Sequence, residues 1–118
     1  MNIVQSKTTP HKLSEQALEL IAARFRLLSE PSRLKLINLL QAGEKNVSEL
    51  VAASELNQAN VSRHLQALHE AGILARRKEG LTVIYSIADP SIFELCEHVC
   101  GSLQKRLAVH IKAFEPNP

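Results

Sequence analysis

Apolar residues recur at steps of three and four along the first third of the chain, the spacing of helices that bury one face. A first helix is predicted over residues 12–28 and a second from Pro31 to about Leu40. The break between them is expected because Ser29 can cap the second helix and Pro31 suits its first turn. The residues of the second helix expected to point inward are Leu34, Ile37 and Leu40.

Two further helices are predicted to follow, joined by a short turn. Asn46 and Glu49 have the spacing of a variant capping box at the start of a helix over residues 47–53. After the turn, Asn57 can cap a longer helix that ends before Gly72. Two helices joined in this way form a helix-turn-helix.

The stretch from Leu56 to Leu68 has one apolar and one polar face. Val61, Leu65 and Leu68 lie at helical spacing on the apolar face. The other face carries short hydrogen-bonding side chains that suit base edges and phosphates, whereas a solvated surface helix would more often carry Glu and Lys. The candidate DNA-contacting residues of this face are Gln58, Asn60, Ser62, Arg63, His64 and Gln66, together with the cap Asn57.

Residues 73–87 have the alternation of a β-hairpin, with a turn predicted at Glu79-Gly80. The first arm is basic, with Arg76, Arg77 and Lys78 in succession. A basic hairpin directly after a helix-turn-helix has the place of the wing in a winged helix. We therefore expect it to track the phosphate backbone or to enter the minor groove.

Asp89 and Pro90 are predicted to begin a last helix. This helix carries two apolar stripes side by side. The first stripe comprises Phe93, Cys96, Cys100, Leu103, Leu107, His110 and Phe114, and the second comprises Ile92, Leu95 and Val99. Because a small domain cannot cover both stripes, one of them is predicted to meet a partner chain.

Length and composition narrow these predictions. A chain of 118 residues suggests one domain, placed at residues 12–114, with a disordered tail over residues 1–11 and a C-terminal tail over residues 115–118. The formal net charge of +2 permits nucleic-acid binding without arguing for it. The excess of cations lies between residues 57 and 86, the segment expected to contact DNA.

Other compositional features concern the compartment and the class of protein. Cys96 and Cys100 are four residues apart, a spacing that would strain a disulfide within one helix, so a reducing cytoplasm is expected. The sequence has no apolar run long enough to span a bilayer and no apolar core of a signal peptide near its start. It also lacks a Gly-rich phosphate loop and an obvious pair of catalytic carboxylates, so we do not expect an enzyme.

In combination, four segments resemble the ArsR/SmtB family of bacterial winged-helix repressors. These segments are LSEPSRL at 28–34, VSEL at 47–50, LNQANVSRHL at 56–65 and LHEAGIL at 68–74. The resemblance covers roughly residues 20–107. It implies a mainly α fold with a small β-hairpin, in the order four helices, two strands and one helix.

The resemblance also implies a function and the residues that perform it. Members of this family are homodimers that pair through their first and last helices, bind an imperfect inverted repeat in a promoter and leave the DNA when an inducer binds. By residue-wise match, the groove-facing positions are Gln58, Ala59, Ser62, Arg63 and His64, and the wing positions are Arg76, Arg77, Lys78 and Thr82.

Two metal sites found in this family are not expected in this chain. The thiol site that follows a Glu-Leu pair is absent, because Glu49-Leu50 is followed by Val51, Ala52 and Ala53. The zinc site on the last helix retains Asp89 alone, and its other positions hold Ser91, Ser102 and Lys105. No cofactor is therefore expected to be required.

Cys96 and Cys100 leave two interpretations open. Thiols four residues apart on a helix share one face, so they could bind a soft metal ion or be modified by an oxidant or a sulfur species. Cysteine also packs well as a small hydrophobic residue, which makes a purely structural role the alternative. A winged-helix module that binds proteins and not DNA, with structural cysteines, is the alternative to the repressor as a whole.

Overall fold

The computed structural model describes residues 12–107. Along the chain the elements are α1 (Glu15–Leu27), α2 (Pro31–Leu40), β1 (Lys45–Asn46), α3 (Val47–Ser54), α4 (Gln58–Glu70), β2 (Leu74–Glu79), β3 (Thr82–Ile87) and α5 (Ser91–Arg106). The predicted winged helix-turn-helix order is confirmed, with β1 as an additional strand. Both predicted tails lie outside the described residues, as do His110 and Phe114 of the predicted last helix.

Side-chain caps determine where three of the helices begin. The side chain of Ser14 accepts a hydrogen bond from the backbone N–H of Ala17 at the start of α1. Asn46 and Glu49 form a reciprocal capping box at the start of α3, as predicted. The side chain of Asn57 caps α4, also as predicted. These caps satisfy backbone donors that have no partner within a helix.

The start of α2 differs from the prediction. Glu30 occupies the cap position and makes no side-chain cap, whereas the Ser29 hydroxyl donates to the carbonyl of Arg26 in the preceding helix. The expected inward residue Leu34 is 39% exposed, and Leu36 is fully buried in its place. Ile37 and Leu40 are buried as predicted, so the buried face of α2 differs from the predicted one only in having Leu36 in place of Leu34.

The sheet is small and antiparallel, with strand order β1-β3-β2. Glu79 pairs with Thr82, so the tight turn lies at Gly80-Leu81, one residue later than predicted. Gly80 takes a left-handed φ of 63°, which glycine adopts without strain. Strand β1 pairs Lys45 with Tyr85 and was not predicted, because two residues show no periodicity.

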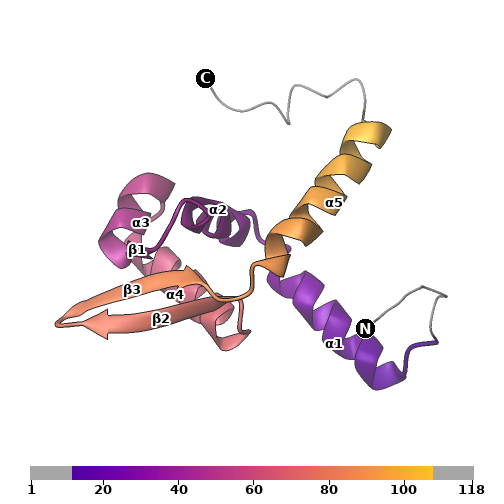
Figure 1. Cartoon of the computed structure of the whole chain (residues 1–118), viewed down its shortest axis with the longest axis horizontal. Coiled ribbons are helices and arrows are strands. Elements are labelled where there is room, and N and C mark those ends of the chain that lie inside the picture. The colour runs from indigo at the N-terminus through magenta and orange to yellow at the C-terminus, as the bar shows by residue number, and fades with distance from the viewer. Residues whose placement is uncertain (1–11, 108–118) are drawn as a thin grey trace.

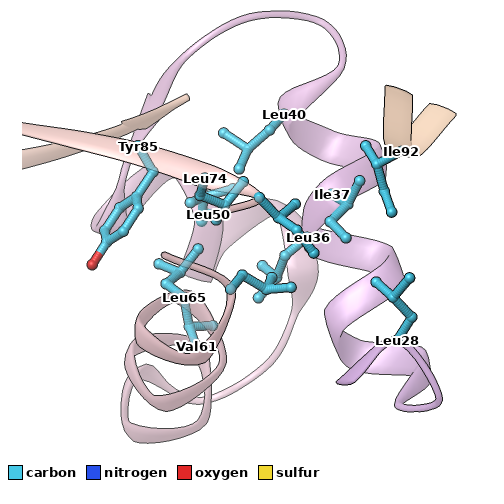
Figure 2. Close-up of a cluster of buried hydrophobic side chains, with 12 residues drawn as sticks. Leu28, Leu36, Ile37, Leu40, Leu50, Val61, Leu65, Leu74, Tyr85 and Ile92 are labelled. Carbon is cyan, nitrogen blue, oxygen red and sulfur yellow. The ribbon is translucent and has the colours of Figure 1, made fainter. Parts of the chain in front are cut away.

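The core lies where α2, α3 and α4 meet the base of the hairpin (Figure 2). Its fully or almost fully buried apolar residues include Leu36, Ile37, Leu50, Leu65 and Leu74. Aliphatic side chains predominate, as expected for a chain with 3% aromatic residues. The helix-turn-helix and the hairpin thus share one core, which holds them in a fixed relation.

Helices α1 and α5 stand out from this body on the side opposite the tip of the hairpin (Figure 1). Helix α1 has no buried residue, and α5 has only Ile92 buried among its described residues. Within residues 12–107, no helix combines the length and the apolar character that crossing a membrane requires.

Candidate nucleic-acid interface

The core holds α4 by one face and leaves its opposite face uncovered. Val61, Leu65 and Leu68 are fully buried, as predicted. The turn before α4 passes through Glu55, which has a left-handed φ of 63°, and the buried Ser54 hydroxyl accepts from the N–H of Leu56. These contacts fix α4 against α3 as the second helix of the helix-turn-helix, and we call α4 the recognition helix.

The uncovered face of the recognition helix brings together most of the predicted DNA-contacting residues. Exposed positions are Asn57, Gln58, Ala59, Ser62, Arg63 and Gln66, while Asn60 is half-buried. The Arg63 guanidinium donates to the Asn60 side-chain oxygen at 2.9 Å. The Gln66 amide donates to Glu70 at 3.1 Å. This face therefore presents amide, hydroxyl and guanidinium groups, which are the groups that read base edges and phosphates.

His64 does not belong to this face, and the expectation that it is exposed there was wrong. Its side chain is 5% exposed, and its Nδ1 accepts a hydrogen bond of 3.0 Å from Nε of Arg33. Burial lowers the pKa of His64, and the charges of Arg33 and Arg63 lower it further. A neutral imidazole with its proton on Nε2 fits this contact.

The spacing of residues could have revealed the position of His64. Together with Val61, Leu65 and Leu68 it completes the i, i+3, i+4, i+7 pattern of a buried helical face. Its partner Arg33 was given no role from the sequence, because 31 positions separate the two residues.

The three basic residues of the hairpin lie on two faces of the strand. Alternation along β2 places Arg76 and Lys78 on the same face as the buried Leu74. Arg77 lies on the other face and contacts two carboxylates, Glu44 and Glu79. Arg77 is therefore already paired with carboxylates, and its contact with DNA stays a prediction, as it does for Arg76 and Lys78.

Arg77 forms a bidentate ion pair with Glu44 and a further hydrogen bond with Glu79. Its Nη1 and Nη2 donate to the two Glu44 oxygens at 2.6 and 2.9 Å, and Nε donates to Glu79 at 3.0 Å. The hydrogen bonds to Glu44 and Glu79 raise the pKa of Arg77. The same contact lowers the pKa of Glu44.

A surface groove runs between the recognition helix and the hairpin. It consists of two adjoining recesses that share Val47, Ser62 and Val83. One recess contains Arg76, Arg77, Lys78 and Tyr85, and the other contains Asn46, Ser48, Gln58, Leu81 and Thr82. Ser48 and Leu81 line this groove but were not predicted as site residues. Leu81, at the tip of the hairpin, is 97% exposed. The groove brings the predicted helix positions Gln58 and Ser62 together with the predicted wing positions, which are Arg76, Arg77, Lys78 and Thr82.

A second surface, on α1, α2 and α5, is apolar. We call it the α1/α5 face, and it is lined by Phe25, Leu28, Leu34, Leu95, Cys96, Val99, Cys100 and Leu103. Phe25, Leu34, Val99 and Leu103 are exposed. Among residues 12–107, an exposed apolar surface of this kind is typical of a protein–protein interface.

Cys96 and Cys100 lie half-buried on the α1/α5 face. Burial raises the pKa of Cys96, which favours the thiol over the thiolate at neutral pH. Within residues 12–107 no three potential ligands from His, Cys, Asp and Glu gather at one point.

Asp89, the residue that matches the first ligand of the family zinc site, has a structural role. Its side-chain oxygen accepts from the N–H of Ser91 at 3.1 Å and from the Ser91 hydroxyl. These hydrogen bonds lower the pKa of Asp89. Pro90 occupies the cap position itself, so the expected cap is displaced by one residue.

Comparison with known proteins identifies the family. Residues 30–76 match the family described as bacterial regulatory protein, arsR family. The HTH-type transcriptional regulator Rv0081 of Mycobacterium tuberculosis is 39% identical over 103 residues, which cover 86% of this chain and 90% of that protein. The transcriptional repressor SmtB homolog of Synechocystis sp. is 32% identical over 96 residues, covering 81% of this chain and 73% of that protein.

Solved structures agree with the sequence comparison. The crystal structure of Rv0081 superposes with a TM-score of 0.74 at 34% identity, covering 83% of this chain and 99% of that one. The homodimeric winged helix-turn-helix domain Mb0332 of Mycobacterium bovis gives a TM-score of 0.69 at 28% identity, covering 86% and 96%. The chain therefore belongs to the ArsR family and is a DNA-binding transcriptional regulator, not an enzyme.

Proposed function

We propose that this chain is a homodimeric repressor that binds an inverted-repeat operator and leaves it when an inducer acts on α5. The observation that supports this most is the separation of two surfaces. A groove lined by polar and basic residues lies between α4 and the hairpin, and an exposed apolar face lies on α1, α2 and α5. Helices α1 and α5 lie away from the tip of the hairpin (Figure 1). Pairing through the second surface leaves the first free for DNA.

The recognition helix would read the major groove. Gln58, Ser62 and Gln66 are four residues apart and form one row along the exposed face, and Arg63 lies beside that row. Amide and guanidinium groups discriminate bases by paired hydrogen bonds. We assign base and phosphate contacts to this row, with Arg76, Lys78 and Thr82 of the hairpin on the phosphates.

Two-fold symmetry of the dimer would be matched by the DNA. A homodimer places its two recognition helices on two half-sites, which we expect to lie about one or two helical turns apart. Pairing through α1 and α5 would bury apolar side chains such as Phe25 and Leu103, both exposed in the single chain.

Selection of DNA from a random pool of duplexes tests the proposal. The full chain should enrich a two-fold sequence and bind it at moderate salt. Arg63→Ala should weaken this binding by roughly 1–3 kcal/mol, as expected when a side chain that reads a base is removed. The matched control is Lys35→Ala, which removes an exposed cation from α2, outside the groove. Enrichment of no sequence, or equal binding by the two variants, would contradict the proposal.

We further propose that a soft metal ion or a thiol-reactive species acts as the inducer at Cys96 and Cys100. Both thiols lie on the face where the second chain would pair, so a ligand or modification there would change how α5 packs. Two copies of the pair would offer up to four sulfur ligands. Because burial raises the pKa of Cys96, proton release should accompany metal binding, and affinity should rise with pH.

Substitution by alanine distinguishes a sensor from a structural role. Cys96→Ala with Cys100→Ala removes both sulfurs and keeps the face apolar. The DNA complexes of wild type and variant are titrated with soft metal ions, oxidants and polysulfide, with mass spectrometry of the thiols alongside. A sensor requires that the variant stay on the DNA under conditions that release the wild type. Equal release of both proteins would show that the cysteines only pack.

A further inference from the structure

One arginine joins α1 to the end of the recognition helix. Nη2 of Arg24 donates to the carbonyl oxygen of Ala71 at 3.0 Å. Ala71 is the C-cap of α4, where carbonyl groups lack partners within the helix. Nη1 of Arg24 also lies 3.9 Å from Oδ2 of Asp89, which precedes α5. A single guanidinium on α1 thus contacts the end of the recognition helix and the residue that leads into α5.

A second arginine joins the middle of the recognition helix to the end of α1. Nε of Arg33, on α2, donates to the buried His64 at 3.0 Å. Nη1 of the same side chain donates to the carbonyl oxygen of Leu27, the last residue of α1, also at 3.0 Å. The planar guanidinium holds both acceptors in a fixed relation.

Together, the Arg24 and Arg33 contacts determine how the recognition helix is oriented relative to α1. His64 and Ala71 are seven residues apart, which corresponds to about 10 Å along a helix axis. Two points at this separation fix how the recognition helix is inclined to α1. Apolar packing of α1 against the core is confined to its end, where Leu27 is half-buried and the following Leu28 is buried. Among the hydrogen bonds of residues 12–107, the one between Arg24 and Ala71 is the direct link from α1 to the end of α4.

We propose that Arg24 and Arg33 are positioning residues that set the separation and inclination of the two recognition helices in the dimer. Neither residue has to contact DNA for this role. The inference rests on the proposed function, that is, on a homodimer that pairs through α1 and α5 and binds two half-sites. It predicts that removing either arginine changes how two half-sites are bound together and leaves binding to one half-site intact.

The test compares Arg24→Gln and Arg33→Gln with Arg26→Gln as a matched control. Arg26 is an exposed cation on the same helix as Arg24. The probes are the two-fold duplex that the wild type selects from a random pool and a duplex that keeps one of its half-sites. Arg24→Gln and Arg33→Gln should each lower the affinity for the two-fold duplex about tenfold, the effect of one charge-assisted hydrogen bond. Their affinity for one half-site should match that of wild type and of Arg26→Gln.

Two further measurements separate positioning from general stability. Arg24→Lys retains one donor for the Ala71 carbonyl and should recover part of the affinity. Repeating the DNA selection with Arg24→Gln should return half-sites at a different or broader separation, which a merely less stable protein would not do.

Three other outcomes would overturn the positioning role of the two arginines. Unchanged affinity ratios and unchanged half-site separation would overturn the inference while leaving the proposed function standing. If sedimentation shows Arg24→Gln to be a monomer, Arg24 acts on dimerisation and the inference is likewise overturned. If the wild type selects no two-fold duplex, the proposed function fails first, and this inference fails with it.

Discussion

Arg77 and Glu44 join the hairpin to the segment that precedes β1. Their side chains meet at two points, with nitrogen–oxygen distances of 2.6 and 2.9 Å. Arg77 also contacts Glu79 at the end of its own strand. Two carboxylates therefore surround this cation and would repel an approaching phosphate, whereas Arg76 and Lys78 lie on the opposite face of the strand.

This arrangement predicts unequal roles for the basic residues of the hairpin. Arg76→Ala and Lys78→Ala should each reduce the slope of log affinity against log salt, by about 0.9 for each phosphate that the side chain neutralises. Arg77→Ala should leave the slope close to that of wild type. Titrations of the selected duplex at several salt concentrations measure the slopes. A greater reduction of the slope in Arg77→Ala than in Arg76→Ala would contradict the assignment.

Asn57 is predicted to serve the helix more than the DNA. Its side-chain oxygen already accepts from the N–H of Asn60 at 2.8 Å. Asn57→Ala should lower the free energy of unfolding by about 1 kcal/mol, the typical contribution of an N-cap. Asn57→Ser keeps a capping oxygen and should retain both the stability and the DNA affinity of wild type. Denaturant unfolding and DNA titration of both variants check this, and a Ser variant that is stable but binds weakly would indicate a direct contact.

His64 should make stability depend on pH in a definite direction. Its pKa in the folded protein lies below the ordinary value of 6.5, because burial and the neighbouring arginines disfavour the charged form. The unfolded chain therefore binds a proton first as the pH falls through about 6.5, and stability decreases from there down to the folded pKa. Above about 6.5 the contribution of His64 is fully present.

Thermal unfolding at about pH 7.5 and about pH 5.5 measures this effect. His64→Asn retains an acceptor for Arg33 and removes the titration, so its melting temperature should fall less on acidification than that of wild type. His98→Asn, which changes an exposed histidine on α5, serves as the control and should behave like wild type. An equal fall for wild type and His64→Asn would contradict the prediction.

The α1/α5 face should control assembly. Leu103→Glu places a charge on this face and should shift the protein toward monomer, because the carboxylate would be desolvated on pairing. Leu81→Glu makes the same change at the tip of the hairpin and should leave the oligomeric state unaltered. Sedimentation equilibrium measures both. A dimer of unchanged strength in Leu103→Glu would show that the chain pairs elsewhere.

Local signals account for the parts of the fold that the sequence predicted. Asn46 and Asn57 act through hydrogen bonds within three residues, so their caps can be read directly from the chain. The fully buried face of α4 follows from the spacing of Val61, Leu65 and Leu68. By contrast, β1 exists because Lys45 and Asn46 pair with a strand almost forty residues away, and no local pattern signals that pairing.

The same distinction between local and distant contacts explains why the partners of two candidate residues were not predicted. The sequence identified Arg77 and His64 by residue type and position, but their roles depend on partners distant in the chain. Arg77 meets Glu44 across 33 positions, and His64 meets Arg33 across 31. Alternation along the strand could have separated Arg77 from its neighbours, although it could not have supplied the carboxylate that holds it.

The most direct test of the groove between α4 and the hairpin as the DNA-binding surface is to map the residues that DNA binding affects. Amide chemical shifts of the full chain are recorded with and without the selected duplex. We expect the largest changes at residues 58–66 of α4 and 76–82 of the hairpin, with small changes at the exposed positions of α5. Largest changes on α1 and α5, with the groove between α4 and the hairpin unaffected, would contradict the assignment of this groove as the DNA-binding surface.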